Sequence, residues 1–168
     1  MGRLGFSWGC AVAAVALSLG WAPPAAAQDP IAELQAQFNR ETDPVRKAKA
    51  LTKLGDAQLN LANQETDAGN FAQALKIFQE YRDEVKTAHA ALKASGIDAE
   101  RRPNGFKQLQ MHVRKAIREI GQTTLAVPVE QRKPFEATRE ELLYIEKELI
   151  DMLFPRPHEK LKPPKQKG

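Results

Sequence analysis

Cysteine is the residue that this sequence most conspicuously lacks. Its 168 residues contain one cysteine, Cys10, and two tryptophans, Trp8 and Trp21. All three lie in a segment laid out like a secretory signal, with Arg3 near the start, a long apolar run and a small-residue stretch, APPAAA. We therefore expect residues 1–27 to be removed as a signal peptide. The exported chain would then have no cysteine, which excludes disulfide bonds.

A retained membrane anchor is the alternative that this segment leaves open. The apolar run, residues 4–21, barely reaches the roughly 18 to 20 residues that a membrane span needs. Gly9, Ser18 and Gly20 dilute it, which favours cleavage. We expect an exported protein, periplasmic or extracellular, without a retained span.

Catalytic signatures are scarce in the rest of the chain. Beyond the signal there is one serine, Ser95, and it stands where a helix is expected to end, so a serine or cysteine hydrolase is excluded. No glycine-rich phosphate loop is present, and His158-Glu159 does not complete a zinc-peptidase motif, because Lys162 occupies the place of its second histidine. We expect a protein that is not an enzyme, with no catalytic residue and no cofactor.

The positive net charge of +4 is concentrated in one short segment. Residues 28–154 carry 19 Lys and Arg against 20 Asp and Glu, whereas residues 155–168, PRPHEKLKPPKQKG, carry five basic residues and one acid. A nearly neutral body offers no basic face for nucleic acid. The proline-rich tail cannot bury apolar area, so we expect it to be disordered. Its charge favours contact with an anionic envelope surface or an acidic protein.

Apolar residues recur at spacings of three and four, which predicts helices throughout. Asp29-Pro30 and Asp43-Pro44 are expected helix starts, and Gly69 and Ser95-Gly96 are expected ends. The clearest register has a seven-residue repeat and comprises Phe71, Ala74, Phe78, Tyr81, Val85, Ala88 and Leu92.

Two further apolar registers complete the expected fold. They begin at Phe106 and Phe135, and Pro103-Asn104-Gly105 is the expected turn before the first of them. The sequence therefore predicts an all-α domain over residues 28–154. We expect an antiparallel four-helix bundle of two long hairpins, residues 43–94 and 105–154, plus a short N-terminal helix.

The first hairpin resembles a tetratricopeptide repeat. The residues that carry the resemblance are Leu54, Gly55, Gly69, Phe71, Ala74 and Phe78. The spacing departs from the family, because Phe71 follows Gly55 by 16 residues, about seven more than the family uses. Ile120-Gly121 gives a fainter echo in the second hairpin. Glycine inside a helix costs about 1 kcal/mol relative to alanine, so Gly55 and Gly121 predict close helix approach.

Two histidines border apolar stripes and are the candidate metal ligands. If their helices are antiparallel neighbours, His89 and His112 come within roughly one helical turn of each other. The alternative function is therefore a metal- or haem-binding bundle, with Met111 and Glu84 as conceivable further ligands. A boundary histidine that only packs and hydrogen-bonds is the simpler interpretation.

The preferred interpretation is an exported, non-enzymatic interaction or envelope-associated module whose partner the sequence does not identify. The groove between the hairpins is the expected partner surface, provided that aromatic side chains stay partly exposed there, namely Phe71, Phe78, Tyr81 or Tyr144. A homodimer is one arrangement that the seven-residue repeat allows.

Overall fold

The computed structural model describes residues 30–155 of the chain, and these residues are almost entirely helical. The helices are α1 (Pro30–Arg40), α2 (Pro44–Asp67), α3 (Phe71–Ala94), α4 (Asn104–Ala126) and α5 (Arg132–Leu153), with a short 3₁₀ turn, η1 (Val129–Gln131), before α5. The expected all-α bundle of two long hairpins with a short N-terminal helix is confirmed. The predicted signal peptide and most of the predicted tail lie outside the described residues.

Local chemistry explains where most helices begin and end. The Asp43 side chain caps α2 by accepting a hydrogen bond from the backbone N–H of Arg46 at 2.8 Å, and Pro44 occupies the first helical position. Gly69 and Gly96 follow α2 and α3 with φ of +76° and +66°, a left-handed conformation that glycine adopts without strain. Pro155 follows Phe154, the cap residue of α5, and cannot continue the helix.

One boundary differs from the sequence-based prediction. The turn expected at Pro103-Asn104-Gly105 is instead the start of α4, with Pro103 as the cap residue. Gly105 is buried and closely packed. An added Cβ there would lie 3.1 Å from Leu92 Cδ2 and 3.2 Å from Val45 Cα. The residue therefore serves close packing of α4 on α2 and α3, and not a turn.

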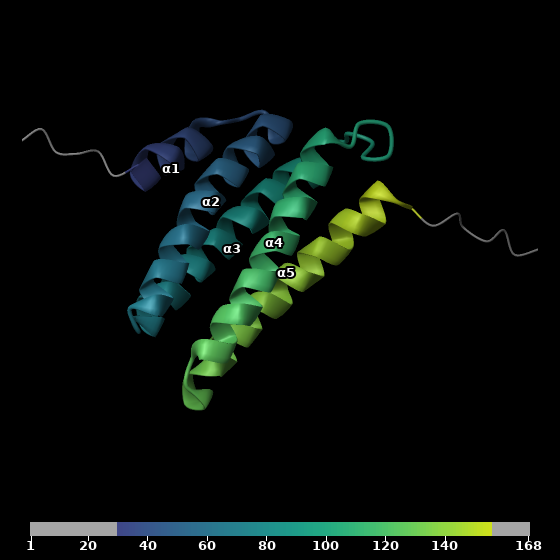
Figure 1. Cartoon of the computed structure of the whole chain (residues 1–168). Coiled ribbons are helices and arrows are strands. Elements are labelled where there is room, and N and C mark those ends of the chain that lie inside the picture. The colour runs from purple at the N-terminus through teal and green to yellow at the C-terminus, as the bar shows by residue number, and fades with distance from the viewer. Residues whose placement is uncertain (1–29, 156–168) are drawn as a thin grey trace, which may run out of the picture.

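The two hairpins lie side by side (Figure 1). Helices α2 and α3 form one antiparallel pair, and α4 and α5 form the other. Between the pairs, α2 lies beside α4 and α3 beside α5, and these neighbours run parallel, whereas α2 and α5 are not in contact. Helix α1 packs on α2. The resemblance to a tetratricopeptide repeat stays a prediction.

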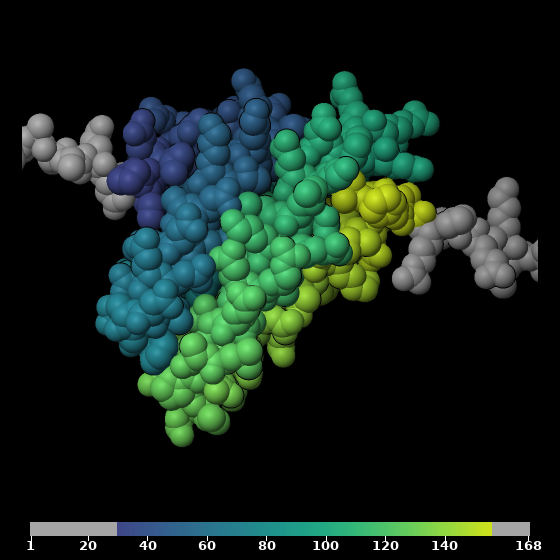
Figure 2. Space-filling view, viewed as in Figure 1, coloured from purple at the N-terminus to yellow at the C-terminus, as the bar shows by residue number. Residues whose placement is uncertain are grey.

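The predicted apolar stripes form the core between the hairpins. The ring of Phe78 on α3 meets the edge of Phe135 on α5, with ring centroids 6.2 Å apart. The largest side chains that are almost fully buried are Tyr81, Phe78, Phe106, Phe135, Leu51, Leu54, Leu59, Leu92, Leu109, Ile120, Leu142 and Leu149. Away from this core the hairpin tips separate, and Figure 2 shows the teal tip of α2/α3 and the green tip of α4/α5 as distinct projections. Within residues 30–155, no helix is both long and apolar enough to cross a membrane.

We predict that Asp43→Ala lowers the free energy of unfolding by about 1 kcal/mol, because α2 loses its side-chain cap. Asn70 provides a matched control, since it stands at the same position of α3 but makes no side-chain cap bond. Asn70→Ala should change stability by no more than about 0.5 kcal/mol. Urea unfolding followed by circular dichroism measures both, and equal effects would contradict the assigned role of Asp43.

Candidate functional site

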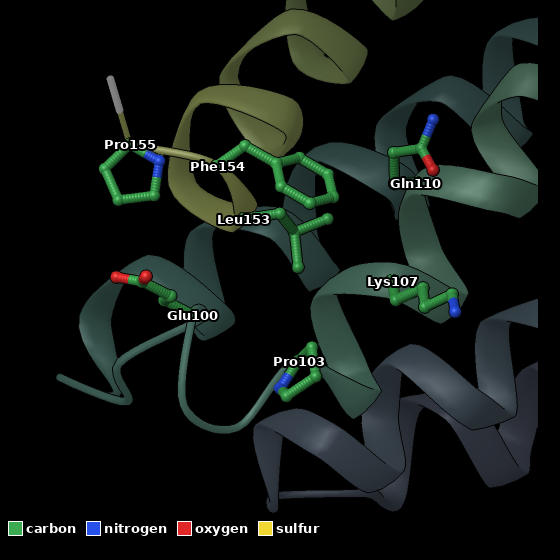
Figure 3. Close-up of a pocket in the computed structure, with 7 residues that line it drawn as sticks. All are labelled: Glu100, Pro103, Lys107, Gln110, Leu153, Phe154 and Pro155. Carbon is green, nitrogen blue, oxygen red and sulfur yellow. The ribbon is translucent and has the colours of Figure 1, made fainter. Parts of the chain in front are cut away.

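A hollow lies at the end of α5, between that helix, the start of α4 and the loop before α4 (Figure 3). We call it the terminal hollow. Its volume is about 740 Å³, within the roughly 300 to 1,000 Å³ that is typical of ligand sites. It is lined by Glu100, Pro103, Lys107, Gln110, Leu153, Phe154 and Pro155. The lining thus combines four apolar residues with one acid, one base and one amide.

The end of α5 exposes an aromatic ring beside this hollow. Pro155 stops the helix, and Phe154 leaves helical geometry with φ of −134° and ψ of 67°. Its side chain is 72% exposed, whereas Leu153, one residue earlier, is only 7% exposed. The opposite wall is fixed by Ala99 of the loop, which is buried in the core. A projecting ring therefore stands next to a partly apolar recess.

The predicted partner groove between the hairpins is closed. Phe78 and Tyr81 are completely buried there and Phe71 is half-buried, so the expectation that they stay available to a partner is wrong for the first two. Of the four aromatic residues expected at this groove, only Tyr144, on the outer surface of α5, is largely exposed, at 63%. The apolar stripes that suggested a groove are used to join one hairpin to the other.

His112 belongs to a chain of polar contacts that runs from the buried Tyr81 to Asp56 and Lys115 at the surface. Its Nδ1 lies 2.8 Å from the hydroxyl of Tyr81, and its Nε2 lies 3.3 Å from Oδ1 of Asp56. Lys115 donates to the same Asp56 oxygen at 2.7 Å. Burial raises the pKa of Tyr81 and lowers that of His112, although Asp56 acts to raise the latter. A protonated tyrosine donates to Nδ1, so the neutral imidazole holds its proton on Nε2 and donates it to Asp56.

Gly55 makes room for this arrangement. An added Cβ there would lie 2.5 Å from Cε1 of His112 and 2.7 Å from Cε2 of Tyr81. The predicted close approach at Gly55 is therefore confirmed. Gly121 differs, because an added Cβ there would meet only the flexible side chain of Arg139, at an ordinary 3.5 Å.

His89 has different surroundings. Its Nε2 is 3.5 Å from Oε2 of Glu148 on α5, and burial lowers its pKa against the opposing charge of Glu148. Lys93 and Tyr144 hold the other oxygen of that carboxylate, at 3.2 Å and 3.3 Å. These residues tie α3 to α5 at the surface of the bundle.

The two histidines therefore do not share the site that the sequence suggested. His112 contacts Tyr81, and His89 lies eight residues further along α3, which is about 12 Å along the helix axis. The expectation treated α3 and α4 as close neighbours, but α4 packs mainly on α2 and α5. Across residues 30–155, no group of three or more His, Cys, Asp or Glu side chains is placed to hold a metal ion.

Glu84, one of the two further conceivable ligands, faces α1 and α2. Gln58 on α2 donates a hydrogen bond to its Oε1 at 3.2 Å, while Oε2 is buried with no hydrogen-bond partner in the described chain. Burial raises the pKa of Glu84 to about 7, helped by the nearby charges of Glu80 and Asp83 and opposed by the side-chain amides of Gln58 and Gln35. Its carboxyl is thus partly protonated at neutral pH.

The terminal hollow was not predicted from the sequence, because most of its lining residues lie outside the apolar registers. Phe154 directly follows Leu153, the last buried position of α5, and directly precedes Pro155. An aromatic residue that is off the stripe and beside a helix-stopping proline is the signal that marks an exposed ring. No protein-family model, curated protein or solved structure matches this chain. Function is therefore argued from these residues alone.

Replacing Tyr81 by phenylalanine should lower the free energy of unfolding by about 1–3 kcal/mol, because the buried Nδ1 of His112 loses its donor. Tyr144→Phe is the matched control, since its hydroxyl bonds Glu148 at the exposed surface and its loss should change stability by no more than about 0.5 kcal/mol. Equal losses in urea unfolding would show that the Tyr81 hydroxyl is not needed.

Glu84 should make stability depend on pH. Its pKa is about 7 in the folded chain against 4.5 for the free side chain, so the folded state binds the proton more tightly. Its contribution is fully present below about pH 4.5 and is lost as the pH rises through 7. Between pH 4.5 and 8, the free energy of unfolding of Glu84→Gln should rise by about 1–2 kcal/mol relative to that of the wild type. The value is this small because the side chain is only half-buried. A difference that stays constant over this range, measured by urea unfolding, would contradict the assignment.

Proposed function

We propose that this protein is an exported, non-enzymatic helical interaction module that binds a protein partner at the terminal hollow. The observation that carries the proposal is the 72% exposure of Phe154 beside an apolar recess of about 740 Å³. Protein interfaces concentrate their binding energy in a few aromatic or aliphatic anchors seated in pockets. A surface with both an anchor and a pocket suits such a contact.

Polar groups at the rim would orient the bound partner. Glu100, Lys107 and Gln110 surround the apolar walls formed by Leu153 and Phe154 (Figure 3). Opposite charges on the two sides of a pocket discriminate between partners more than they add affinity. The proposed partner is therefore a folded protein surface with an apolar anchor and complementary charges.

Two earlier predictions stand beside this proposal. Export and contact of the basic tail with an anionic envelope surface rest on residues outside the described part of the chain. The metal- or haem-binding alternative is weaker, because His112 would have to give up its contacts with Tyr81 and Asp56 to bind a metal, and His89 lies eight residues beyond Tyr81 along α3.

A photo-reactive residue in place of Pro103, which lines the hollow and makes no side-chain cap bond, should capture the partner in cells that export the protein. We expect the adduct to be lost on adding Phe154→Asp and kept on adding Val129→Asp. Val129 is the matched control because it is 69% exposed but lies at the other end of α5. Binding at the terminal hollow would be contradicted by an adduct that persists with Phe154→Asp, or by an adduct that both substitutions abolish.

A further inference from the structure

The terminal hollow presents a projection and a recess on one surface. Phe154 stands out from the end of α5, and Leu153, Pro103 and Pro155 line the space next to it. A surface that carries both parts is suited to pairing with a copy of itself. In a twofold interface the same patch is used on both subunits, so each projection meets the other copy's recess.

The charges around the hollow fit such a pairing. In Figure 3, Glu100 and Lys107 lie on opposite sides of the hollow, with Leu153 between them. Neither the Glu100 carboxylate nor the Lys107 ammonium takes part in an ion pair within residues 30–155. Both are therefore available to a partner.

Only one orientation of a twofold axis makes these charges attract. Consider an axis that lies in the interface plane, midway between Glu100 and Lys107 and perpendicular to the line that joins them. It places each Glu100 opposite Lys107 of the second copy. With the two hollows face to face, Phe154 of each copy faces the recess of the other. An axis along the line that joins the two charges would instead place Glu100 against Glu100, which is repulsive. The charge pattern thus selects one self-complementary arrangement.

We propose that the partner bound at the terminal hollow is a second copy of this chain, joined by two reciprocal Glu100–Lys107 ion pairs around the Phe154 rings. This inference rests on the proposed function and names its partner. The hollow has seven lining residues per copy, fewer than the roughly 20 to 30 a side of a standard stable interface. We therefore expect a reversible dimer that dissociates on dilution.

Charge exchange provides the test. Glu100→Lys and Lys107→Glu each place like charges opposite one another, and each should raise the dimer dissociation constant by about tenfold or more. The double variant restores two attractive pairs with their signs exchanged, so it should recover dimerisation close to that of the wild type. The measurement is sedimentation velocity of the purified exported chain over a range of concentrations.

Phe154→Asp and Val129→Asp complete the set. The first should give a monomer at all concentrations, and the second should dimerise like the wild type. Unchanged circular dichroism and urea midpoints in every variant show that the fold is intact. A wild type that stays monomeric, a dimer that Phe154→Asp does not weaken, or a double variant no better than the single ones would overturn the dimer.

The same set separates the dimer from the proposed function. If the purified chain is monomeric but the photo-reactive residue at position 103 still captures a different protein in a Phe154-dependent manner, the second copy is wrong as the partner and the hollow stands as a binding site. If the captured adduct has the mass of two copies and the charge exchange behaves as expected, the dimer is supported.

Discussion

The close approach of α4 to α2 at Gly55 is the constraint on which the packing of the two hairpins depends. A side chain at this position would overlap His112 and Tyr81, with an added Cβ only 2.5 Å and 2.7 Å from their rings. Because the position has no side chain, His112 can reach across to Tyr81 on α3 and Asp56 on α2 at once. Three helices are joined by one buried group.

Apolar stripes alone would not fix how far one hairpin slides along the other. The stripes on α3, α4 and α5 repeat at spacings of three and four, so a shift by one repeat would again set apolar residues against apolar residues. The Tyr81–His112 contact is satisfied in one alignment only. A buried polar pair left without its partner is costly, which makes every other alignment unfavourable.

The sequence predicted what depends on local pattern and missed what depends on this alignment. Helix starts at Pro44 and ends near Gly69 and Gly96 follow from backbone preferences of the residues themselves, and so does the core role of the stripes. The need for close approach at Gly55 was also readable, since glycine is unfavourable inside a helix. The separation of His89 from His112 was not, because it depends on which helices become neighbours. The loop before α4 lets α4 settle against α2, so α3 and α4 face each other only weakly.

The terminal hollow is a further consequence of that alignment. Helices α4 and α5 form an antiparallel pair of 23 and 22 residues, so the end of α5 comes level with the start of α4. The loop that carries Glu100 closes the third side, and it is held there because Ala99 is buried in the core. Phe154 is the first residue past α5 and finds no further turn of α4 or α3 to pack against, which leaves its ring exposed. The same arrangement therefore buries Tyr81 and Phe78 between the hairpins and leaves Phe154 exposed at the end of the bundle, where a partner that needs an apolar anchor would find it.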